Sequence, residues 1–290
     1  NNRLDVFALR PAPIQATWLG YPGTTGSLVI DYRIIDAIAD PPRESDPWYT
    51  ERLLRLRNGF LCYEPSEEAP PVASAPIVRN GYVTFGSFNT FPKLNSQVIE
   101  TWATLLRRVP GARLLVKCKQ LADAGTCQRL RDRFADLGVS PHRIRLMPKV
   151  EGTKGHLAIY HEVDIGLDPF PYNGTTTTCE ALWMGVPVVT LRGERHSGRV
   201  GASILSGLEL EDLIAENKSD YVERAAMLAS DRERLSHLRR TLRPHMMGSA
   251  LCDGPAFSRS FGGMLRKIWI DWCRDQMLTR REKVGTHARG

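Results

Sequence analysis

Residues 164–190 predict a strand, a loop, a helix and a second strand in immediate succession. The sequence divides this unit into a strand at 164–167, a loop at 168–174, a helix from Thr175 to about Met184 and a buried strand at 187–190. Proline and glycine mark the loop, and Gly185 follows the last helical residue as a stop signal. Such a unit restricts the fold strongly, because its strands are parallel and its crossover is right-handed.

The same alternation of strands and helices begins at residue 82. Further strands are expected at 82–86, 113–118 and 144–147, and further helices at 96–109, 121–137 and 156–161. Regular alternation of this kind predicts an α/β fold with a doubly wound, Rossmann-like parallel sheet. Ligands of such sheets bind beyond the carboxyl ends of the strands. The rule brings three loop regions together, namely 86–95, 117–121 with 148–156, and 168–176.

The helix that opens at Thr175 is a candidate anion site. Its first turn has backbone N–H groups without intrahelical partners, and the helix dipole adds positive potential there. Thr175, Thr176 and Thr177 add hydroxyl donors, so this turn suits a phosphate. The alternative is an ordinary N-cap, but one cap needs a single threonine, whereas four follow Asn-Gly here. Glu180 lies within the first two turns, where a carboxylate could accept hydrogen bonds from a ribose diol.

Three basic side chains occur in or beside the loops expected around that helix. Lys93 follows the strand at 82–86, and an ammonium there would neutralise a diphosphate leaving group. Lys117 ends the next strand, and His156 opens a helix where it could stack on a base or bond a phosphate. Each could also be an ordinary surface residue, and the pattern alone leaves that choice open.

Motifs and composition argue against several other classes of protein. No GxGxxG follows the first strand and no GxxxxGK[ST] occurs, which disfavours a nicotinamide cofactor and a P-loop NTPase. No DxD motif or His/Cys cluster indicates a metal. The six cysteines are scattered without a CxxC pair, so we expect free thiols in a reducing cytoplasm. We find no signal peptide and no apolar run long enough to span a membrane, and we expect a cytoplasmic piece of a longer protein.

Charge is distributed unevenly along the chain. The formal net charge is +7, and residues 264–290 contain seven Lys or Arg and three Asp or Glu, which gives 7 − 3 = +4. No aromatic residues are interleaved with the basic ones at the extreme end. We therefore interpret this segment as a solvated helix face and a disordered tail rather than a nucleic-acid site.

Together these motifs resemble the O-GlcNAc transferases of glycosyltransferase family 41. The resemblance is to the C-terminal half of their catalytic region, in the bacterial, tetratricopeptide-associated form. The matching stretches follow one another at the family's spacing: Arg10–Gln15, Gly20–Gly26, Asp31–Tyr32, Phe88–Asn89, Lys93–Leu94, Asp168–Thr177, Ala181–Trp183, Gly185–Pro187 and Arg199–Val200. Among these, the glycine-rich loop Gly20–Gly26 could on its own be a tight turn or a ligand-binding loop.

The resemblance implies a GT-B fold and a reaction. The reaction is the inverting, metal-independent transfer of N-acetylglucosamine from UDP-GlcNAc to a Ser or Thr hydroxyl of a protein. Lys93 would be the essential lysine on the diphosphate. The residues implied to hold the UDP-sugar are Gly20, Tyr21, Asn89, Thr90, Lys93, Lys117, His156, Thr175, Thr176, Thr177 and Glu180. No cofactor or metal is expected, and the implied partners are the sugar donor and a protein acceptor.

The resemblance and the composition together predict five segments. They are the remainder of an N-terminal catalytic lobe at 1–32, a linker-like stretch at 33–75, a nucleotide-sugar lobe at 76–255, a helix packing back toward the N-terminal lobe at 256–278 and a disordered basic tail at 279–290. The rest of the N-terminal lobe, its active-site histidine and the tetratricopeptide repeats would precede residue 1. The isolated chain is therefore expected to bind UDP but to transfer sugar poorly or not at all.

Departures from the animal enzyme weaken the assignment of the sugar. Thr90 and Pro92 replace Gln and Tyr of the animal enzyme's uridine loop, and Thr175 replaces its His. Two alternatives therefore stay open. One is a UDP-sugar-binding module without activity of its own, and the other is a related protein glycosyltransferase that uses glucose or fucose.

Overall fold

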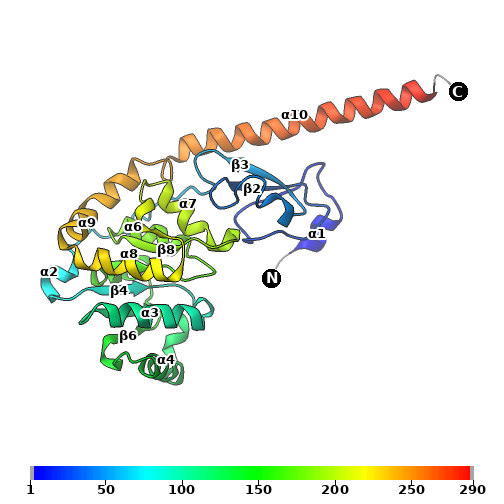
Figure 1. Cartoon of the computed structure of the whole chain (residues 1–290). Coiled ribbons are helices and arrows are strands. Elements are labelled where there is room, and N and C mark those ends of the chain that lie inside the picture. The colour runs from blue at the N-terminus through cyan, green and yellow to red at the C-terminus, as the bar shows by residue number, and fades with distance from the viewer. Residues whose placement is uncertain (1–2, 288–290) are drawn as a thin grey trace. The chain divides into compact units, whose positions relative to one another are not determined.

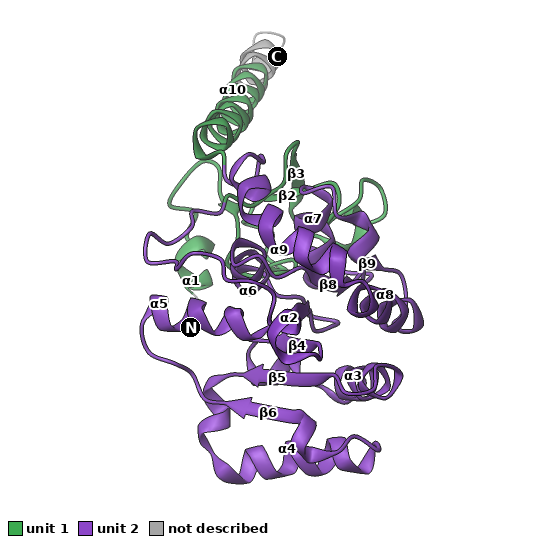
Figure 2. Cartoon of the chain, turned by 90° about the vertical axis from the view of Figure 1, so that its left-hand side faces the viewer, with its two compact units in different colours: residues 1–62, 253–290 green, residues 63–252 purple. Residues whose placement is uncertain are grey.

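The computed structural model describes residues 3–287, with side chains described up to residue 278. The chain forms two compact units, residues 1–62 with 253–290 and residues 63–252 (Figure 2). Each unit has its own sheet, and each is described by itself below. The five-segment division drawn from the sequence remains a prediction, and part of its last segment, 288–290, lies outside the described residues.

The larger unit is built on a six-stranded parallel sheet with strand order β6-β5-β4-β7-β8-β9 (Figure 1). Its strands are β4 (Thr84–Ser87), β5 (Arg113–Lys117), β6 (Ile144–Met147), β7 (Ile165–Leu167), β8 (Val188–Leu191) and β9 (Ile214–Ala215). The chain runs outward from β4 to β6 and then outward in the other direction from β7 to β9. The topological switch point therefore lies between β4 and β7. The predicted α/β fold with a doubly wound sheet is confirmed.

Helices cover both faces of this sheet. They are α2 (Pro76–Asn80), α3 (Ser96–Arg108), α4 (Ala124–Asp136), α5 (Thr153–Ala158), α6 (Thr176–Trp183), α7 (Val200–Ser206), α8 (Lys218–Ser230) and α9 (Arg232–Met247). Right-handed crossovers place α3 and α4 on one face and α6 and α7 on the other. Short 3-10 turns are η2 (Phe91–Lys93), η3 (Lys119–Ala122), η4 (Pro141–Arg143), η5 (Ile159–Glu162), η6 (His196–Gly198) and η7 (Glu211–Leu213).

Apolar periodicity and caps explain why these helices form where they do. On α3, Val98, Trp102 and Leu105 recur at helical spacing and are 0–1% exposed. The Asn95 side chain accepts a hydrogen bond from the Val98 N–H at 3.1 Å and so caps the start of α3. Asp123 caps α4 in the same way, at 2.6 Å from the Thr126 nitrogen. This cap explains why α4 begins at Ala124, a few residues later than the sequence suggested.

Two buried charged side chains fix the amino-terminal edge of the sheet. Arg239, which is 2% exposed, donates to the carbonyls of Ala73, Val163 and Tyr160 at 2.8–3.0 Å. Asp164 accepts from the backbone N–H groups of Ile77 and Thr84 at 2.9 and 2.8 Å. Burial lowers the pKa of Arg239 to about 10, against the opposing charge of Asp164. These bonds tie α9, the segment before α2 and the start of β4 together.

The smaller unit contains a three-stranded parallel sheet in the order β1-β2-β3. Its elements are α1 (Leu4–Ala8), β1 (Ala16–Thr17), β2 (Tyr32–Asp36), η1 (Asp46–Trp48), β3 (Arg52–Leu56) and α10 (Gly254–His287). Two of these strands lie in a region that its prolines had suggested to be irregular. Parallel pairing of β2 with β3 over five residues overrides that local signal.

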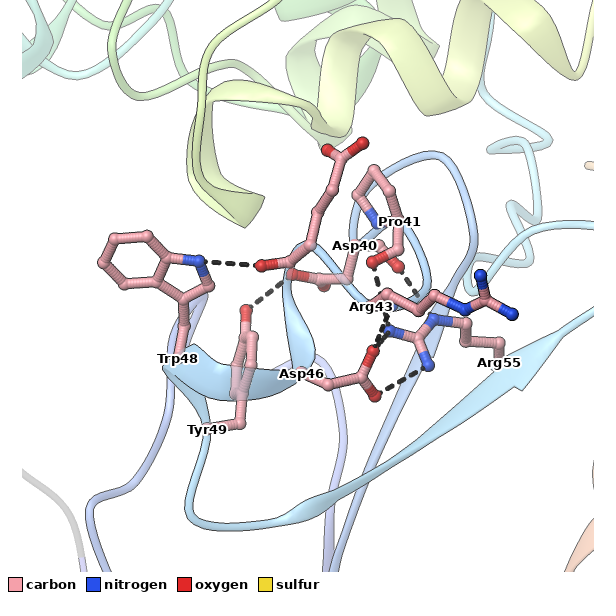
Figure 3. Close-up of polar contacts among 8 residues, drawn as sticks. Asp40, Pro41, Arg43, Asp46, Trp48, Tyr49 and Arg55 are labelled. Carbon is pink, nitrogen blue, oxygen red and sulfur yellow. Dashed lines mark hydrogen bonds and ion pairs between the residues drawn. The ribbon is translucent and has the colours of Figure 1, made fainter.

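A polar network closes the connection between β2 and β3 (Figure 3). The Arg55 guanidinium forms two hydrogen bonds to the Asp46 carboxylate, at 2.9 and 3.1 Å, and also donates to the Asp40 carbonyl at 2.8 Å. The Tyr49 hydroxyl donates to the Asp40 carboxylate at 2.7 Å. The bidentate pair lowers the pKa of Asp46. The loop is thereby held in one conformation.

α10 packs on the strand region of its own unit through Trp18. The Trp18 ring lies 5.7 Å from Phe257 and 4.8 Å from Phe261, and its indole donates to the Phe60 carbonyl at 2.9 Å. The apolar stripe of this helix is covered only in part, because Trp269 remains 49% exposed.

Candidate functional site

A cavity of about 620 Å³ opens beyond the carboxyl ends of β4 and β7, on the larger unit. Six of the residues suggested by the sequence line it together, namely Asn89, Thr90, Lys93, Thr175, Thr176 and Thr177. Phe88, Pro92, Asn95, Pro171 and Tyr172 complete the lining. This is the position that the switch point of a doubly wound sheet predicts for a ligand. Its size is that of a typical small-molecule site.

Lys93 is oriented by contacts that leave its charge uncompensated. Its Nζ donates to the carbonyl of Asn173 at 2.6 Å and lies 4.2 Å from the centre of the Tyr172 ring. A third contact, to Asn89 Oδ1, is longer at 3.4 Å. Burial lowers the pKa of Lys93, and the negative charge of Asp168 opposes that effect. The ammonium is thus fixed at the cavity wall.

The amino terminus of α6 forms another part of the cavity wall. Thr175, the N-cap residue, makes no side-chain capping hydrogen bond. The first backbone N–H groups of α6 therefore need a partner from outside the helix, and the dipole favours an anion. The Thr177 hydroxyl donates to Asn89 Oδ1 at 3.2 Å, which links this wall to the loop after β4. The arrangement suits a phosphate group.

Gly174 allows the close approach on which this wall depends. A Cβ at this position would lie 2.5 Å from Thr177 Oγ1 and 2.8 Å from Thr178 Oγ1. Only glycine fits at that separation. The Gly174 N–H donates to the Asp168 carboxylate at 2.6 Å, so the loop turns tightly into α6.

Asp168 is a buried organising residue that was absent from the candidates drawn from the sequence. Besides Gly174, its carboxylate accepts from the Thr190 hydroxyl at 2.7 Å, and its backbone carbonyl accepts from Tyr221 at 3.1 Å. Burial raises the pKa of the Asp168 carboxyl to about 7, while the hydrogen bonds from Gly174 and Thr190 and the charge of Lys93 act in the other direction. An acidic residue directly after a predicted strand, in a loop of two prolines, Asn and Gly, was the available signal.

Lys117, His156 and Glu180 form a second cluster. Lys117 Nζ donates to His156 Nδ1, since an ammonium has no lone pair to accept with, and His156 Nε2 lies 2.9 Å from Glu180 Oε2. This order places the imidazole proton on Nε2. Burial lowers the pKa of Lys117 to about 8, against the attraction of Glu180. Three predicted residues from β5, α5 and α6 are therefore connected by hydrogen bonds.

Phe88 lies between the cavity that contains Lys93 and the cluster of Lys117, His156 and Glu180. It lines the cavity, and its ring centre lies 4.7 Å from Lys117 Nζ and 4.5 Å from the Tyr160 ring. A ligand with a charged end near Lys93 and an aromatic end near Phe88 would touch both clusters. Nine predicted residues of the larger unit are thus gathered at one end of its sheet. Their individual roles remain predictions.

Gly20 and Tyr21 belong to the smaller unit. Tyr21 is 62% exposed, and the rest of their loop is tied down. The Glu51 carboxylate accepts from the Thr24 hydroxyl at 2.8 Å and from the Thr25 N–H at 2.6 Å, and it also pairs with the Thr25 hydroxyl. Arg33, which is 2% exposed, donates to the Gly23 carbonyl at 2.7 Å. The hydrogen bonds of Glu51 and Arg33 therefore hold residues 23–25 of this loop in place.

The described residues match neither the pattern of a metal site nor that of a membrane-spanning helix. Among the described side chains, residues 3–278, no group of three or more His, Cys, Asp or Glu is placed to hold a metal ion. Over the same residues, no helix combines the length and the apolar character needed to cross a membrane. The expectation that no cofactor is needed remains a prediction.

The family model for glycosyl transferase family 41 matches residues 1–70 and 72–261. The chain belongs to this family. The chain is 49% identical over 273 residues to a probable UDP-N-acetylglucosamine–peptide N-acetylglucosaminyltransferase SPINDLY of Solanum lycopersicum, covering 94% of this chain and 29% of that protein. The UDP-N-acetylglucosamine–peptide N-acetylglucosaminyltransferase of Caenorhabditis elegans is 22% identical, over 92% of this chain and 33% of its own length. The chain thus spans about a third of these relatives or less.

A mutant O-GlcNAc transferase of Thermobaculum terrenum is similar in structure. It superposes with a TM-score of 0.88 at 37% identity, over 94% of this chain and 51% of its own. A sucrose-phosphate synthase of Thermosynechococcus elongatus, at 15% identity and a TM-score of 0.52, shares the fold alone. These neighbours confirm that the family 41 chain has the predicted GT-B type of fold.

Proposed function

We propose that the protein containing this chain transfers N-acetylglucosamine from UDP-GlcNAc to Ser or Thr side chains of proteins. The observation that supports this most is the shared cavity of Lys93 and the α6 threonines, in a chain of family 41. The relatives described above are named as peptide N-acetylglucosaminyltransferases, which supports the same donor and acceptor. The donor is held between an ammonium and a helix amino terminus, with the diphosphate as their common ligand.

In this reaction the acceptor hydroxyl oxygen forms a bond to the sugar's C1 while the bond from C1 to the diphosphate breaks. The electron pair of the broken bond leaves with UDP, and the configuration at C1 of the sugar is inverted. Lys93 and the N–H and hydroxyl groups of Thr175, Thr176 and Thr177 stabilise the negative charge that develops on the diphosphate. They can do so without a metal ion, and we propose a metal-independent reaction. The base that takes the hydroxyl proton is expected outside these 290 residues.

The second cluster is assigned to the nucleoside. Glu180 accepts hydrogen bonds from the ribose diol, and His156 and Lys117 approach the uracil and the phosphate edge. The chain from Lys117 through His156 to Glu180 supports this assignment, because it orients the carboxylate before the ligand arrives. Gly20 and Tyr21 are proposed to border the sugar.

The wider setting is also a proposal. Because the chain spans only part of its relatives, we infer that the parent protein supplies the rest of the N-terminal lobe and tetratricopeptide repeats. We place the parent in the cytoplasm of a bacterium, with a protein acceptor and neither nucleic acid nor membrane as a partner.

The test uses the full-length parent and this chain side by side. In the parent, Lys93→Ala should lower the rate of transfer from UDP-GlcNAc by at least 100-fold, while the exposed Lys119→Ala should leave it unchanged. UDP-glucose and GDP-fucose serve as competing donors, because Thr90, Pro92 and Thr175 differ from the animal enzyme. Faster transfer from either of these donors would overturn the assignment of the sugar.

The chain alone should bind UDP and show no more than trace transfer. Calorimetric titration with UDP, repeated on Lys93→Ala and Thr176→Val, locates the nucleotide. Weaker binding in both variants is expected. Full turnover by the isolated chain would contradict the need for a second lobe, and a parent that binds UDP without any transfer would favour a binding module.

A further inference from the structure

A second cavity lies at the other end of the same sheet. It has a volume of about 360 Å³ and is formed around the amino ends of β4, β5 and β6. It shares no lining residue with the cavity that contains Lys93. The cavity is strongly basic. Glu162 is the single carboxylate in its lining, and the five arginines that line it are Arg79, Arg113, Arg131, Arg143 and Arg145.

Two of these five arginines have protein partners that satisfy them. Arg143 donates to the carbonyls of Leu106, Val109 and Ala112 at 2.7–3.0 Å, so it serves the fold. Arg145 forms an ion pair with Glu162. The one carboxylate in the cavity lining, that of Glu162, is therefore already paired with Arg145.

The charges of the other three arginines are not neutralised by a carboxylate. Within the described part of the chain, Arg79, Arg113 and Arg131 form no ion pair. Arg79 Nε donates to the uncharged Asn80 Oδ1 at 3.3 Å. Arg113 lies 4.1 Å over the Tyr82 ring, a contact that orients its guanidinium without neutralising it. Three positive charges from α2, β5 and α4 therefore converge on one hollow.

Strand register shows that part of this lining is a continuous surface. Thr84 pairs with Arg113, and Leu115, two residues along β5, pairs with Arg145. Paired residues on parallel strands point to the same face, as do residues two apart. Part of the cavity lining therefore combines a hydroxyl, an apolar side chain and two guanidinium groups on one sheet face.

We propose that this cavity binds a small phosphorylated metabolite. Guanidinium groups match the phosphate oxygens in a bidentate fashion, and three of them balance the two or more charges of a phosphoryl compound. The volume is that of a small-molecule site rather than of an extended surface for a protein segment. The proposal does not depend on what the Lys93 cavity binds.

The test is calorimetric titration of the 290-residue chain with inorganic pyrophosphate, in the presence of saturating UDP to occupy the first cavity. We expect one pyrophosphate to bind. Binding should weaken at least tenfold in the double variant Arg113→Gln/Arg131→Gln. The matched control is Arg232→Gln/Arg240→Gln, which removes the same charge from exposed positions of α9. Circular dichroism confirms that each variant is folded.

Three results would overturn the proposal. One is the absence of pyrophosphate binding by the unmodified chain. Another is equal weakening in the cavity variant and the α9 control, which would indicate a general effect of charge. The third is tighter binding of an unphosphorylated Asp/Glu hexapeptide than of pyrophosphate, which would assign the surface to an acidic protein segment instead.

Discussion

At the scale of single residues, the site depends on charges held away from neutralising partners. Lys93 is held by a backbone carbonyl and an aromatic ring, and no carboxylate pairs with it in the described structure. Lys117 donates to an imidazole. Burial lowers the pKa of both lysines, while these contacts keep them oriented. Under the proposed function, the diphosphate of the donor supplies the missing negative charge.

The lowered pKa of Lys117 predicts a pH dependence. Its folded-state pKa of about 8 lies below the ordinary 10.5, so the ammonium is lost as the pH rises through about 8. UDP affinity should therefore fall between pH 7 and pH 9. The negative charge of Glu180 on α6 favours the ammonium form of Lys117, whereas burial and the positive charge of Lys149 disfavour it. His156 on α5 accepts the hydrogen bond that Lys117 donates.

Isothermal titration at several pH values measures this dependence. Lys117→Met should bind UDP more weakly at pH 7 and show a flatter profile. If the fall in affinity between pH 7 and pH 9 is as steep in Lys117→Met as in the unmodified chain, another group causes it.

At the scale of elements, the turn from β7 into α6 is the part most sensitive to substitution. Gly174→Ala places a methyl group 2.5 Å from Thr177 Oγ1 and 3.1 Å from Asn89 Oδ1, so the Thr177 hydroxyl and its contact with Asn89 must shift. We expect at least a tenfold loss of UDP affinity with the unit still folded. Gly262→Ala, where the added Cβ meets nothing within 4 Å, is the matched control and should bind UDP normally. Unchanged binding by Gly174→Ala would mean that the threonines do not contact the ligand.

The buried arginine of α9 predicts an effect on stability rather than on binding. Arg239→Met removes the side-chain donor from the carbonyls of Ala73, Val163 and Tyr160 and removes the positive charge near Asp164. The free energy of unfolding should fall by about 3 kcal/mol. Arg240→Met, its exposed neighbour, should change it by less than about 0.5 kcal/mol. Denaturant unfolding measures both, and similar losses in the two variants would refute the role given to Arg239.

At the scale of the whole molecule, the proposed reaction needs the loop of the smaller unit as well as the cavity of the larger one. Burial tends to raise the pKa of Glu51, but hydrogen bonds from Thr25 and Thr24 outweigh it, and the pKa is lowered. The ionised carboxylate therefore holds the Gly20–Gly26 loop. In the parent enzyme, Glu51→Gln should lower kcat about tenfold while UDP affinity stays the same. A change in UDP affinity with kcat intact would contradict this role.

Much of the larger unit could be predicted because its signals are local. Apolar periodicity and Gly185 outlined the strands and helices, and the switch-point rule gathered loops far apart in sequence. Asp168 and Asn173 escaped prediction, because their importance comes from partners on other elements, such as Thr190 and Gly201. In the smaller unit, prolines obscured strands that only pairing with distant residues stabilises.

The proposed nucleotide contacts all lie within residues 63–252, and this links two equilibria, ligand binding and unfolding. A nucleotide that binds only the folded form at 100 times its dissociation constant adds about 2.7 kcal/mol to the stability of that form. Under the proposed function, the sugar donor is thus also a folding ligand for this unit. The fraction of the enzyme that survives proteolysis would then follow the cell's supply of activated sugar.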